Sequence, residues 1–295
     1  MPKCHIVGIY PAPAMVEDRL ILYNAVRLLA NRFLRQLPVV DREGRAIGVI
    51  AIRDVLRYLN DVVSRGESIL DALSAASVRN VARIPAVTLT YGRFSIFDVF
   101  NTMKEKGIGL IPITSEDGRL IGIVNEEHLA SLIKNNSYVA TGLRVDDIAT
   151  SPAIGVPLNT TFADALRVMG ERGFRHLPVL DEKNRPIMIV TARDLLRFIM
   201  RDSTIKLLEA GKQDEVLKTP ITHIGRPEPV RVETGTNLDE ALSIMAIAGI
   251  GGLLIVDEDE RLKGIVTDMD IVTRLPDKLG ETFDRLVEKI VPLCP

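Results

Sequence analysis

The sequence predicts a mixed α/β fold, of the α+β kind, built from four copies of one βαββα unit that are arranged as two pairs. The first observation is a gapless internal duplication: residues 35–59 align with residues 175–199, and 11 of the 25 positions are identical. The second is a gapless match between residues 109–128 and 251–270, at an offset of 142 residues. Repetition at a fixed offset is typical of repeat architectures, so we expect two related pairs, each packed about a pseudo-twofold axis.

A hairpin of two strands is predicted in every unit. Acidic residues or glycine stand between two apolar runs at residues 41–44, 115–118, 181–184 and 257–260. Short turns of this composition between apolar runs favour a β-hairpin, because these residues tolerate a tight backbone. A helix is expected after each hairpin.

A further helix precedes each hairpin. Apolar residues at helical spacing predict helices over residues 22–32, 96–106, 164–172 and 238–248. Gly107, Gly173 and Gly249 follow three of them as helix C-caps, whereas Phe33 stands at that place in the first. A proline-marked loop and a short strand lie before each helix, around residues 11–14, 85–88, 152–155 and 227–230.

These elements divide the chain into units 1 to 4, at residues 1–66, 77–137, 143–203 and 218–277. Connectors at 61–80 and 201–218 are expected to add helix, and residues 278–295 are expected to form a final helix. The two pairs form modules over residues 1–140 and 141–295, with the boundary in segment 138–143.

Composition indicates a globular chain and excludes several classes of protein. Hydrophobic residues make up 46% of the 295 residues and the net charge is −2, which gives no electrostatic reason to expect nucleic acid as a partner. The longest uncharged run, residues 241–256, is short for a membrane span, and no signal peptide is recognised. Cys4 and Cys294 are too few for a disulfide framework or a cysteine metal site. We expect a cytoplasmic protein without membrane contact.

Two segments at the start of a helix carry the chemistry, Thr191-Ala-Arg-Asp194 and Thr267-Asp-Met-Asp270. One interpretation is a capping box, in which threonine and an acid three residues later satisfy free backbone groups. The other is a ligand site, because a helix N-terminus with a threonine hydroxyl can hold a phosphate and the carboxylate can bind both hydroxyls of a ribose. The two roles are compatible, since a cap can exchange its partner for a ligand.

Basic residues stand before the second strand in two of the units. Arg175 and His176 precede it in unit 3, and Arg35 and Gln36 in unit 1, whereas units 2 and 4 begin this strand at Gly109 and Gly251. An isolated Arg-His pair is commonly a solvated surface feature. Because the Arg175-His176 pair lies at the same end of the sheet as Thr191, contact with a phosphate is an equally supported interpretation.

The repeat resembles the cystathionine β-synthase (CBS) domain, pairs of which form the Bateman module. The resemblance rests on the strand–helix–strand–strand–helix order and on the segments that end in Asp194 and Asp270, and its four copies cover nearly the whole chain. Four such domains are also the architecture of the gamma subunit of AMP-activated protein kinase. The resemblance implies an adenosine-containing ligand in the cleft between paired domains.

Unit 3 matches the family pattern best. There the resemblance implies a set of nucleotide-binding residues: Asp194 for ribose, Thr191, Arg175 and His176 for phosphate, Thr150 and Ala153 near the base, and Arg193 within the same segment. Unit 4 keeps Thr267 and Asp270. Unit 1 keeps Arg35 and Asp54 but has Ala51 in place of threonine, and unit 2 has Asn125 and His128 in place of the Thr/Asp pair. We therefore expect the main site in the 3–4 module.

Three functions stay open on the sequence. The first is a non-catalytic regulatory protein that binds AMP, ADP or ATP and passes the energy state to a regulated protein. The second is binding of S-adenosylmethionine or a related adenosyl compound, which needs no phosphate contacts. The third is a structural or nucleic-acid scaffold with empty clefts.

Enzymatic activity is not expected, because no phosphate loop, nucleophile elbow or kinase signature occurs. The four histidines lack metal-ligand spacing, so no metal is required. A homodimer is compatible with the symmetry.

Overall fold

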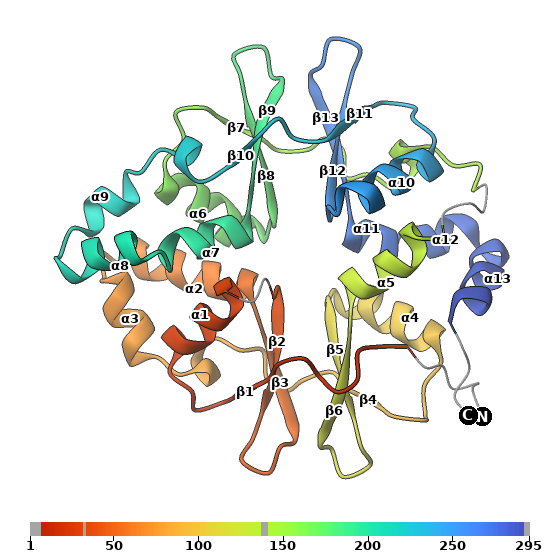
Figure 1. Ribbon diagram of the computed structural model, residues 1–295, viewed down its shortest axis with the longest axis horizontal. Coiled ribbons are helices and arrows are strands. Elements are labelled where there is room, and N and C mark those ends of the chain that lie inside the picture. Colours follow the sequence, from red (N-terminus) through yellow and green to blue (C-terminus); the bar gives the residue numbers. More distant parts are fainter. Residues whose placement is uncertain (1–6, 32–33, 137–140, 292–295) are drawn as a thin grey trace.

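The computed structural model describes residues 7–31, 34–136 and 141–291, and it contains one small sheet for each unit (Figure 1). The strands of units 1 and 2 are β1 Val16–Glu17, β2 Gln36–Val40, β3 Ala46–Ala51, β4 Leu89–Thr90, β5 Leu110–Thr114 and β6 Leu120–Asn125. Those of units 3 and 4 are β7 Val156–Pro157, β8 His176–Leu180, β9 Pro186–Thr191, β10 Arg226–Pro227, β11 Arg231–Glu233, β12 Gly252–Val256 and β13 Leu262–Thr267. The predicted α/β fold class and its four repeats are confirmed.

Each sheet has the same register. The short first strand runs parallel to the middle strand, and the middle and last strands form the predicted antiparallel hairpin with a bulge near the turn. The aspartate that opens the turn fixes it in three units: Oδ1 of Asp41, Asp181 and Asp257 accepts hydrogen bonds from backbone N–H groups two and four residues later. The acidic turns therefore have a structural role.

The helices follow the predicted order. They are α1 Leu22–Asn31, α2 Ile52–Ser64, α3 Ile69–Ala75, α4 Ile96–Lys106, α5 Glu126–Lys134, α6 Phe162–Arg172, α7 Ala192–Ile199, α8 Asp202–Glu209, α9 Gln213–Leu217, α10 Leu238–Ala248, α11 Asp268–Thr273, α12 Leu275–Leu279 and α13 Glu281–Ile290. Gly107, Gly173 and Gly249 adopt positive φ as C-caps, as predicted. Helix α6 begins two residues before the predicted start because Thr161 forms a capping box with Asp164.

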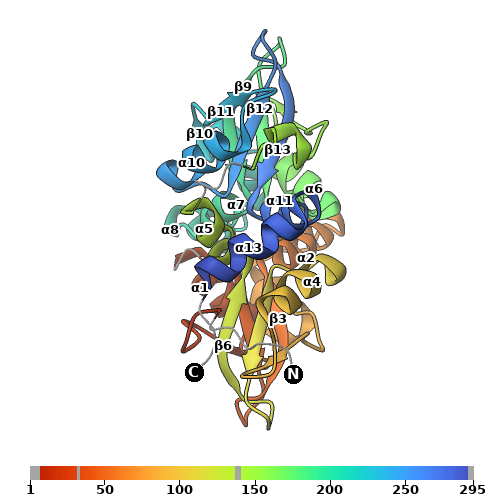
Figure 2. The same cartoon turned by 90° about the vertical axis from the view of Figure 1, so that its right-hand side faces the viewer.

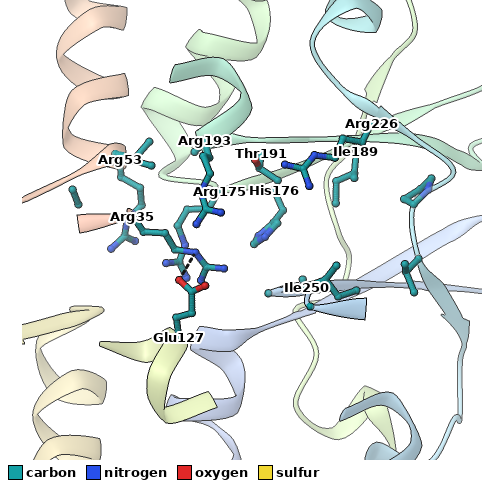
Figure 3. A pocket seen from close by; sticks show the side chains of 18 of the residues that line it. Arg35, Arg53, Glu127, Arg175, His176, Ile189, Thr191, Arg193, Arg226 and Ile250 are labelled. Atoms are coloured by element: carbon teal, nitrogen blue, oxygen red, sulfur yellow. Dashed lines mark ion pairs between the residues drawn. The ribbon is translucent and has the colours of Figure 1, made fainter. Parts of the chain in front are cut away.

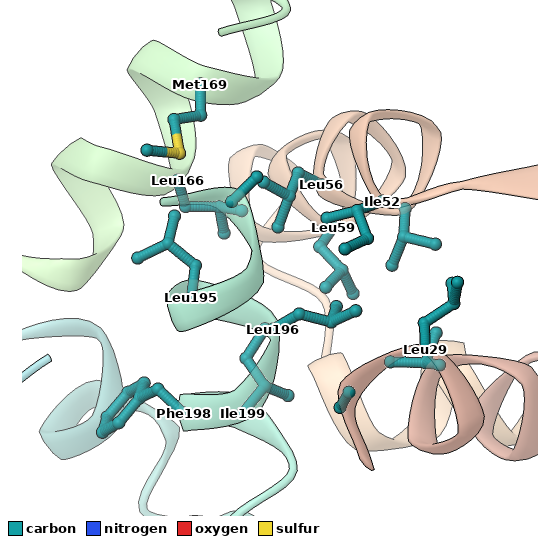
Figure 4. Close-up of a cluster of buried hydrophobic side chains, with 14 of the residues drawn as sticks. Leu29, Ile52, Leu56, Leu59, Leu166, Met169, Leu195, Leu196, Phe198 and Ile199 are labelled. Atoms are coloured by element: carbon teal, nitrogen blue, oxygen red, sulfur yellow. The ribbon is translucent and has the colours of Figure 1, made fainter. Parts of the chain in front are cut away.

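Within a module, the separate sheets of the two units lie side by side, and the helices make the contact between the two modules. In Figure 1 the hairpins of units 1 and 2 lie side by side at one end of the molecule and those of units 3 and 4 at the other, with the helices between them. One hydrophobic core combines helices of units 1 and 3 and contains Leu56, Leu166, Leu195 and Ile199 (Figure 4). The second core combines units 2 and 4. The modules thus stack within one chain into the flat body that Figure 2 shows from its side.

Connectors close the helix layer on both sides. Helix α3 and the pair α8–α9 meet beside units 1 and 3, where Gln213 accepts from the backbone of Ile69 and donates to that of Glu67. Helix α13 covers units 2 and 4 through Phe283 and Val287, so helix forms in the region where the final helix was expected.

The unit and module boundaries themselves stay predictions. Residues 137–140 of the module boundary, residues 32–33 at the end of the first predicted helix, and Cys4 and Cys294 lie outside the described residues.

The segment that precedes each unit's first strand crosses to the other unit of its module. We call these the approach segments, residues 7–14, 82–87, 149–155 and 224–230. They pair with the last strand of the partner unit through the bridges Ile9–Ile123, Arg83–Val49, Thr150–Ile265 and Arg226–Ile189. Each cleft is therefore built from two units.

Candidate functional site

A cavity of about 250 Å³ lies where all four units meet (Figure 3). We call it the unit 3 cavity, because the junction of β9 and α7 forms one wall through Ile189, Thr191, Ala192 and Arg193. Unit 4 adds the approach segment from Arg226 to Val230 and the turn from Gly249 to Gly252. Units 1 and 2 complete the lining with Arg35, Gln36, Ala51, Ile52, Arg53 and Glu127.

The start of α7 is fixed by a capping box. Thr191 Oγ1 donates to Asp194 Oδ2 over 2.6 Å and accepts from the backbone N–H of Asp194 over 3.2 Å, while Thr191 N–H donates to the same carboxylate over 3.0 Å. The capping interpretation of Thr191 and Asp194 is thus realised. The N–H groups of Ala192 and Asp194 are engaged by the Arg175 carbonyl and by Thr191 Oγ1, but the positive end of the helix dipole, at the cavity wall formed by Ala192 and Arg193, still favours an anion.

Asp194 does not itself line the unit 3 cavity. Its Oδ1 accepts a hydrogen bond from Arg226 Nη2 over 3.1 Å, and Arg226 comes from the approach segment of unit 4. The predicted ribose carboxylate is therefore covered by an arginine, and a ribose must take the place of Arg226 to reach it.

The cavity is strongly cationic. Five arginines line it, Arg35, Arg53, Arg175, Arg193 and Arg226, against the two carboxylates Glu127 and Glu228. Figure 3 shows Arg35, Arg175 and Arg193 converging on the same space, with the ion pair of Arg35 to Glu127 (3.3 Å) drawn as a dashed line. Burial and then the charge of Arg35 lower the pKa of Arg193. Such a cluster attracts a multiply charged anion.

Two buried ion pairs join the modules diagonally. Arg35 of unit 1 donates to Asp268 of unit 4 over 2.8 Å, and Arg175 of unit 3 pairs with Glu126 of unit 2. Lys134 Nζ also contacts Asp268, over 2.8 Å. Asp268 is fully buried, and although burial alone would raise its pKa, Arg35 and Lys134 hold that pKa below its usual value. Arg35 and Arg175 thus have carboxylate partners even without a ligand.

Glycine makes room for both of these pairs. A Cβ atom on Gly109 would lie 1.4 Å from Oε2 of Glu126, and one on Gly251 would lie 2.3 Å from Oδ2 of Asp268. These glycines stand where units 1 and 3 carry Arg35 and Arg175. The absence of basic residues in units 2 and 4, which the sequence shows, therefore has a steric reason.

His176 lies against the backbone of unit 4. A Cβ atom on Gly252 would be 2.9 Å from its Nε2 atom. Burial, followed by the neighbouring charges of Arg175 and Arg35, lowers the pKa of His176 to about 3. The imidazole is therefore neutral near pH 7 and can donate or accept a hydrogen bond in the cavity.

Unit 1 has a second cavity, of about 240 Å³, which we call the unit 1 cavity. Asp54 lines it, and its Oδ1 atom forms an ion pair with Arg83 over 2.8 Å. Ala51 stands at the position of Thr191, so this helix start has no hydroxyl to offer. Arg35, which we expected together with Asp54, lies in the unit 3 cavity.

Unit 2 has a smaller cavity, of about 90 Å³, beside Asn125. The Asn125 side chain caps α5 by accepting from His128 N–H over 2.7 Å. Unit 2 has His128 at the position of Asp194 and therefore lacks the carboxylate that would bind a ribose. The structure shows only the capping role of Asn125.

One group of expected residues is not brought together. Thr150 and Ala153 were expected near the base of a ligand in unit 3, but they lie on unit 4, where Thr150 Oγ1 donates to Asp270 Oδ1 over 3.3 Å and Ala153 N–H bonds to Lys263. That expectation is wrong because an approach segment crosses to the partner's last strand. Thr267 and Asp270 form a capping box there, and neither lines any of the three cavities above.

Sequence reasoning missed several residues of the site. Arg53, Glu127 and Arg226 line the unit 3 cavity, Glu126 and Asp268 hold two of its arginines, and Lys134 pairs with Asp268. The sequence did hold a signal for Arg226. An arginine shortly before a proline stands at the corresponding place in units 2 and 4, as Arg83 and Arg226. In units 2 and 4 only, the last helix of the unit begins with an acidic residue, Glu126 or Asp268. These residues were the sequence signal for the buried ion pairs.

Within the described ranges, no group of three or more His, Cys, Asp or Glu side chains could hold a metal ion. No helix in those ranges has the length and apolar character needed to cross a membrane.

Comparisons with known proteins agree with this architecture. Residues 11–61, 78–135, 145–201 and 221–277 each match the CBS domain. The chain therefore belongs to the CBS domain family, and the predicted four tandem CBS domains are confirmed.

Two relatives match over almost their whole length. An uncharacterised 33.4 kDa protein in a ribosomal RNA operon of Thermofilum pendens is 32% identical over 92% of this chain and 90% of its own. Protein MJ1225 of Methanocaldococcus jannaschii is 25% identical over 90% of this chain and 94% of its own. The crystal structure of MJ1225, a proposed archaeal homologue of g-AMPK, superposes with a TM-score of 0.81 at 23% identity and covers 91% of this chain and 98% of that one.

Proposed function

We propose that this chain is a non-catalytic regulatory protein that binds an adenine nucleotide, AMP, ADP or ATP, in the unit 3 cavity. The observation that carries the proposal is the meeting of five arginines with the N-terminus of α7 and the Thr191 hydroxyl in one cavity of about 250 Å³. A phosphate needs these groups, whereas a nucleoside or a sulfonium compound does not. The cationic lining thus favours a nucleotide over S-adenosylmethionine.

Each part of the ligand has a matching wall. The phosphates face Thr191, Arg193 and His176, where the positive end of the α7 dipole adds to the positive potential. The ribose binds Asp194 after displacing Arg226. The base lies between Ile189 and the apolar part of the unit 4 wall, Pro229, Val230 and Ile250.

Regulation follows from the composition of the cavity. Residues of all four units line it, so a ligand bound there contacts both modules at once. A ligand can shift an equilibrium between two module packings by its difference in affinity for them. A regulated protein that distinguishes the two packings would then respond to the nucleotide. The cytoplasmic setting, and a homodimer, remain predictions of the sequence.

The test is calorimetric titration of the full chain with AMP, ADP, ATP and S-adenosylmethionine. We expect dissociation constants below about 1 mM for at least one nucleotide. Arg193→Gln and Thr191→Val should weaken nucleotide binding by about tenfold each, since each removes a hydrogen bond to a charged group. Thr267→Val, the same change in unit 4, is the matched control and should leave this binding event unchanged.

Two results would overturn the proposal. One is the absence of any nucleotide binding at millimolar concentration. The other is tight binding of S-adenosylmethionine that Arg193→Gln does not affect, which would assign the cavity to an adenosyl compound without phosphate.

A further inference from the structure

Arg53 lies at the boundary between two cavities. The unit 3 cavity and the unit 1 cavity share Gln36, Ala51 and Arg53, and Arg53 is the only cation among these three. It is the second residue of α2, directly beyond the last strand of unit 1. Its counterpart in unit 3, Arg193, lines the unit 3 cavity but not the unit 1 cavity.

The surroundings of Arg53 compensate its charge only in part. Burial, and then the charges of Arg175 and Arg83, lower the pKa of Arg53, while Glu126 and Asp54 offset this in part. Across the described ranges, Arg53 forms no hydrogen bond or ion pair with another side chain. A guanidinium in this position, between like charges, gains strongly from an incoming anion.

The neighbouring arginines differ in this respect. Arg35 is held by Asp268, Arg175 by Glu126, and Arg83 by Asp54. Each would have to leave a carboxylate in order to bind a ligand phosphate. Arg53 would not, so among these four arginines it is the one that an anion can recruit at least cost.

We propose that Arg53 is a shared anion-binding residue of the unit 1 and unit 3 cavities, and that through it nucleotide binding in one cavity weakens nucleotide binding in the other. The proposal rests on the function proposed above and adds a second site and its coupling. One guanidinium can form a bidentate contact with one phosphate at a time. When the first nucleotide is bound, Arg53 already contacts its phosphate, and the negative charge of that nucleotide repels the second one. The second nucleotide therefore binds more weakly, which is negative coupling.

The unit 1 cavity has what the second nucleotide needs. Asp54 is available for a ribose once Arg83 is displaced, in the same way that Asp194 is covered by Arg226. Lys106 adds a further cation, and Pro85, Val87 and Ile108 provide an apolar wall for a base. Because Ala51 has no hydroxyl, this is the weaker of the two sites.

The experiment is calorimetric titration of the full chain with AMP and, separately, with ATP. In the wild type we expect two binding events per chain, the second about tenfold weaker than the first or more, within the usual range of coupling between sites. Asp54→Ala should abolish the second event and leave the first. Arg53→Gln should weaken the first event several-fold and bring the two dissociation constants closer together, while Arg53→Lys should restore part of the difference.

Arg167→Gln, on the exposed face of α6, is the matched control and should change neither event. Thermal unfolding shows whether Arg53→Gln still folds, and we expect it to, because the substitution removes repulsion between cations. Stoichiometry of one in the wild type, two equal dissociation constants, or a wild-type ratio retained by Arg53→Gln would overturn the inference and leave the proposed function intact. If no nucleotide binds at all, both the inference about Arg53 and the proposed function are contradicted.

Discussion

Arg226 lies across the carboxylate of Asp194, with 3.1 Å between Nη2 and Oδ1. The same arrangement occurs in unit 1, where Arg83 reaches Asp54 over 2.8 Å. In both units the arginine belongs to the approach segment of the other unit in the module. The two carboxylates that suit a ribose are therefore each covered by a side chain that a ligand has to displace.

Replacing Arg226 tests this displacement. Arg226 is 59% exposed, and an exposed ion pair stabilises by at most about 1 kcal/mol, so its loss should cost little folding stability. Arg226→Ala should tighten the binding of adenosine, which has no phosphate, by up to about fivefold, because Asp194 becomes free for the ribose. Calorimetry with adenosine measures this. Arg167→Ala, which removes an exposed arginine that lines neither cavity, is the control, and unchanged or weaker adenosine binding to Arg226→Ala would contradict the prediction.

The buried carboxylate of Asp268 holds two cations, Arg35 and Lys134. Asp268→Asn removes the buried charge that both cations contact most closely, and leaves Arg35 with its longer ion pairs to Glu126 and Glu127 and Lys134 with the carbonyl of Ile250. We expect a loss of about 3–5 kcal/mol in the free energy of unfolding, as is typical when one member of a buried pair is removed. Urea denaturation measures this. Asp259→Asn, which breaks an exposed pair with Arg261, should cost less than about 1 kcal/mol, and an equal loss in the two variants would show that the buried pair has no special weight.

Gly251 provides the space for that pair. Gly251→Ala would place Cβ 2.3 Å from Nη2 of Arg35 and from Oδ2 of Asp268, so the pair has to separate. We expect a loss of about 1–3 kcal/mol, the usual cost of overpacking. The double variant Gly251→Ala, Asp268→Asn should lose clearly less than the sum of the two single variants, because both act on the same contact. Strict additivity in urea denaturation would show that the clash lies elsewhere.

The repeat made most of the fold predictable. Gapless copies at 35–59 and 175–199 fixed the order of strand, hairpin and helix, because a buried face repeats its apolar pattern wherever the same unit packs. Gly107, Gly173 and Gly249 marked three helix ends correctly, since a left-handed C-cap favours glycine for a local reason.

The site was predictable only where it depends on local geometry. Thr191 and Asp194 form the expected capping box, which needs no information beyond four neighbouring residues. Thr150 was assigned to the wrong cleft, because the crossing of an approach segment to the partner's strand depends on how two units pack. Arg53 and Glu127 were missed for the same reason: four helix starts meet at the centre of the molecule, and spacing along the chain does not report that meeting.

His176 makes stability depend on pH. The folded protein holds the imidazole neutral down to a pKa of about 3, whereas the unfolded chain takes up a proton below the ordinary value of about 6.5. Between these values the unfolded state binds more protons, so the free energy of unfolding falls as the pH falls, by about 1.4 kcal/mol per pH unit from this residue. Urea denaturation at pH 7.0 and pH 4.5 should therefore show a larger loss in the wild type than in His176→Gln, a change that introduces the residue found at Gln36 in unit 1. His223→Asn, at an exposed site, should lose as much as the wild type. Equal losses in the wild type and His176→Gln would mean that His176 is protonated in the folded protein, and would remove the neutral imidazole from the cavity.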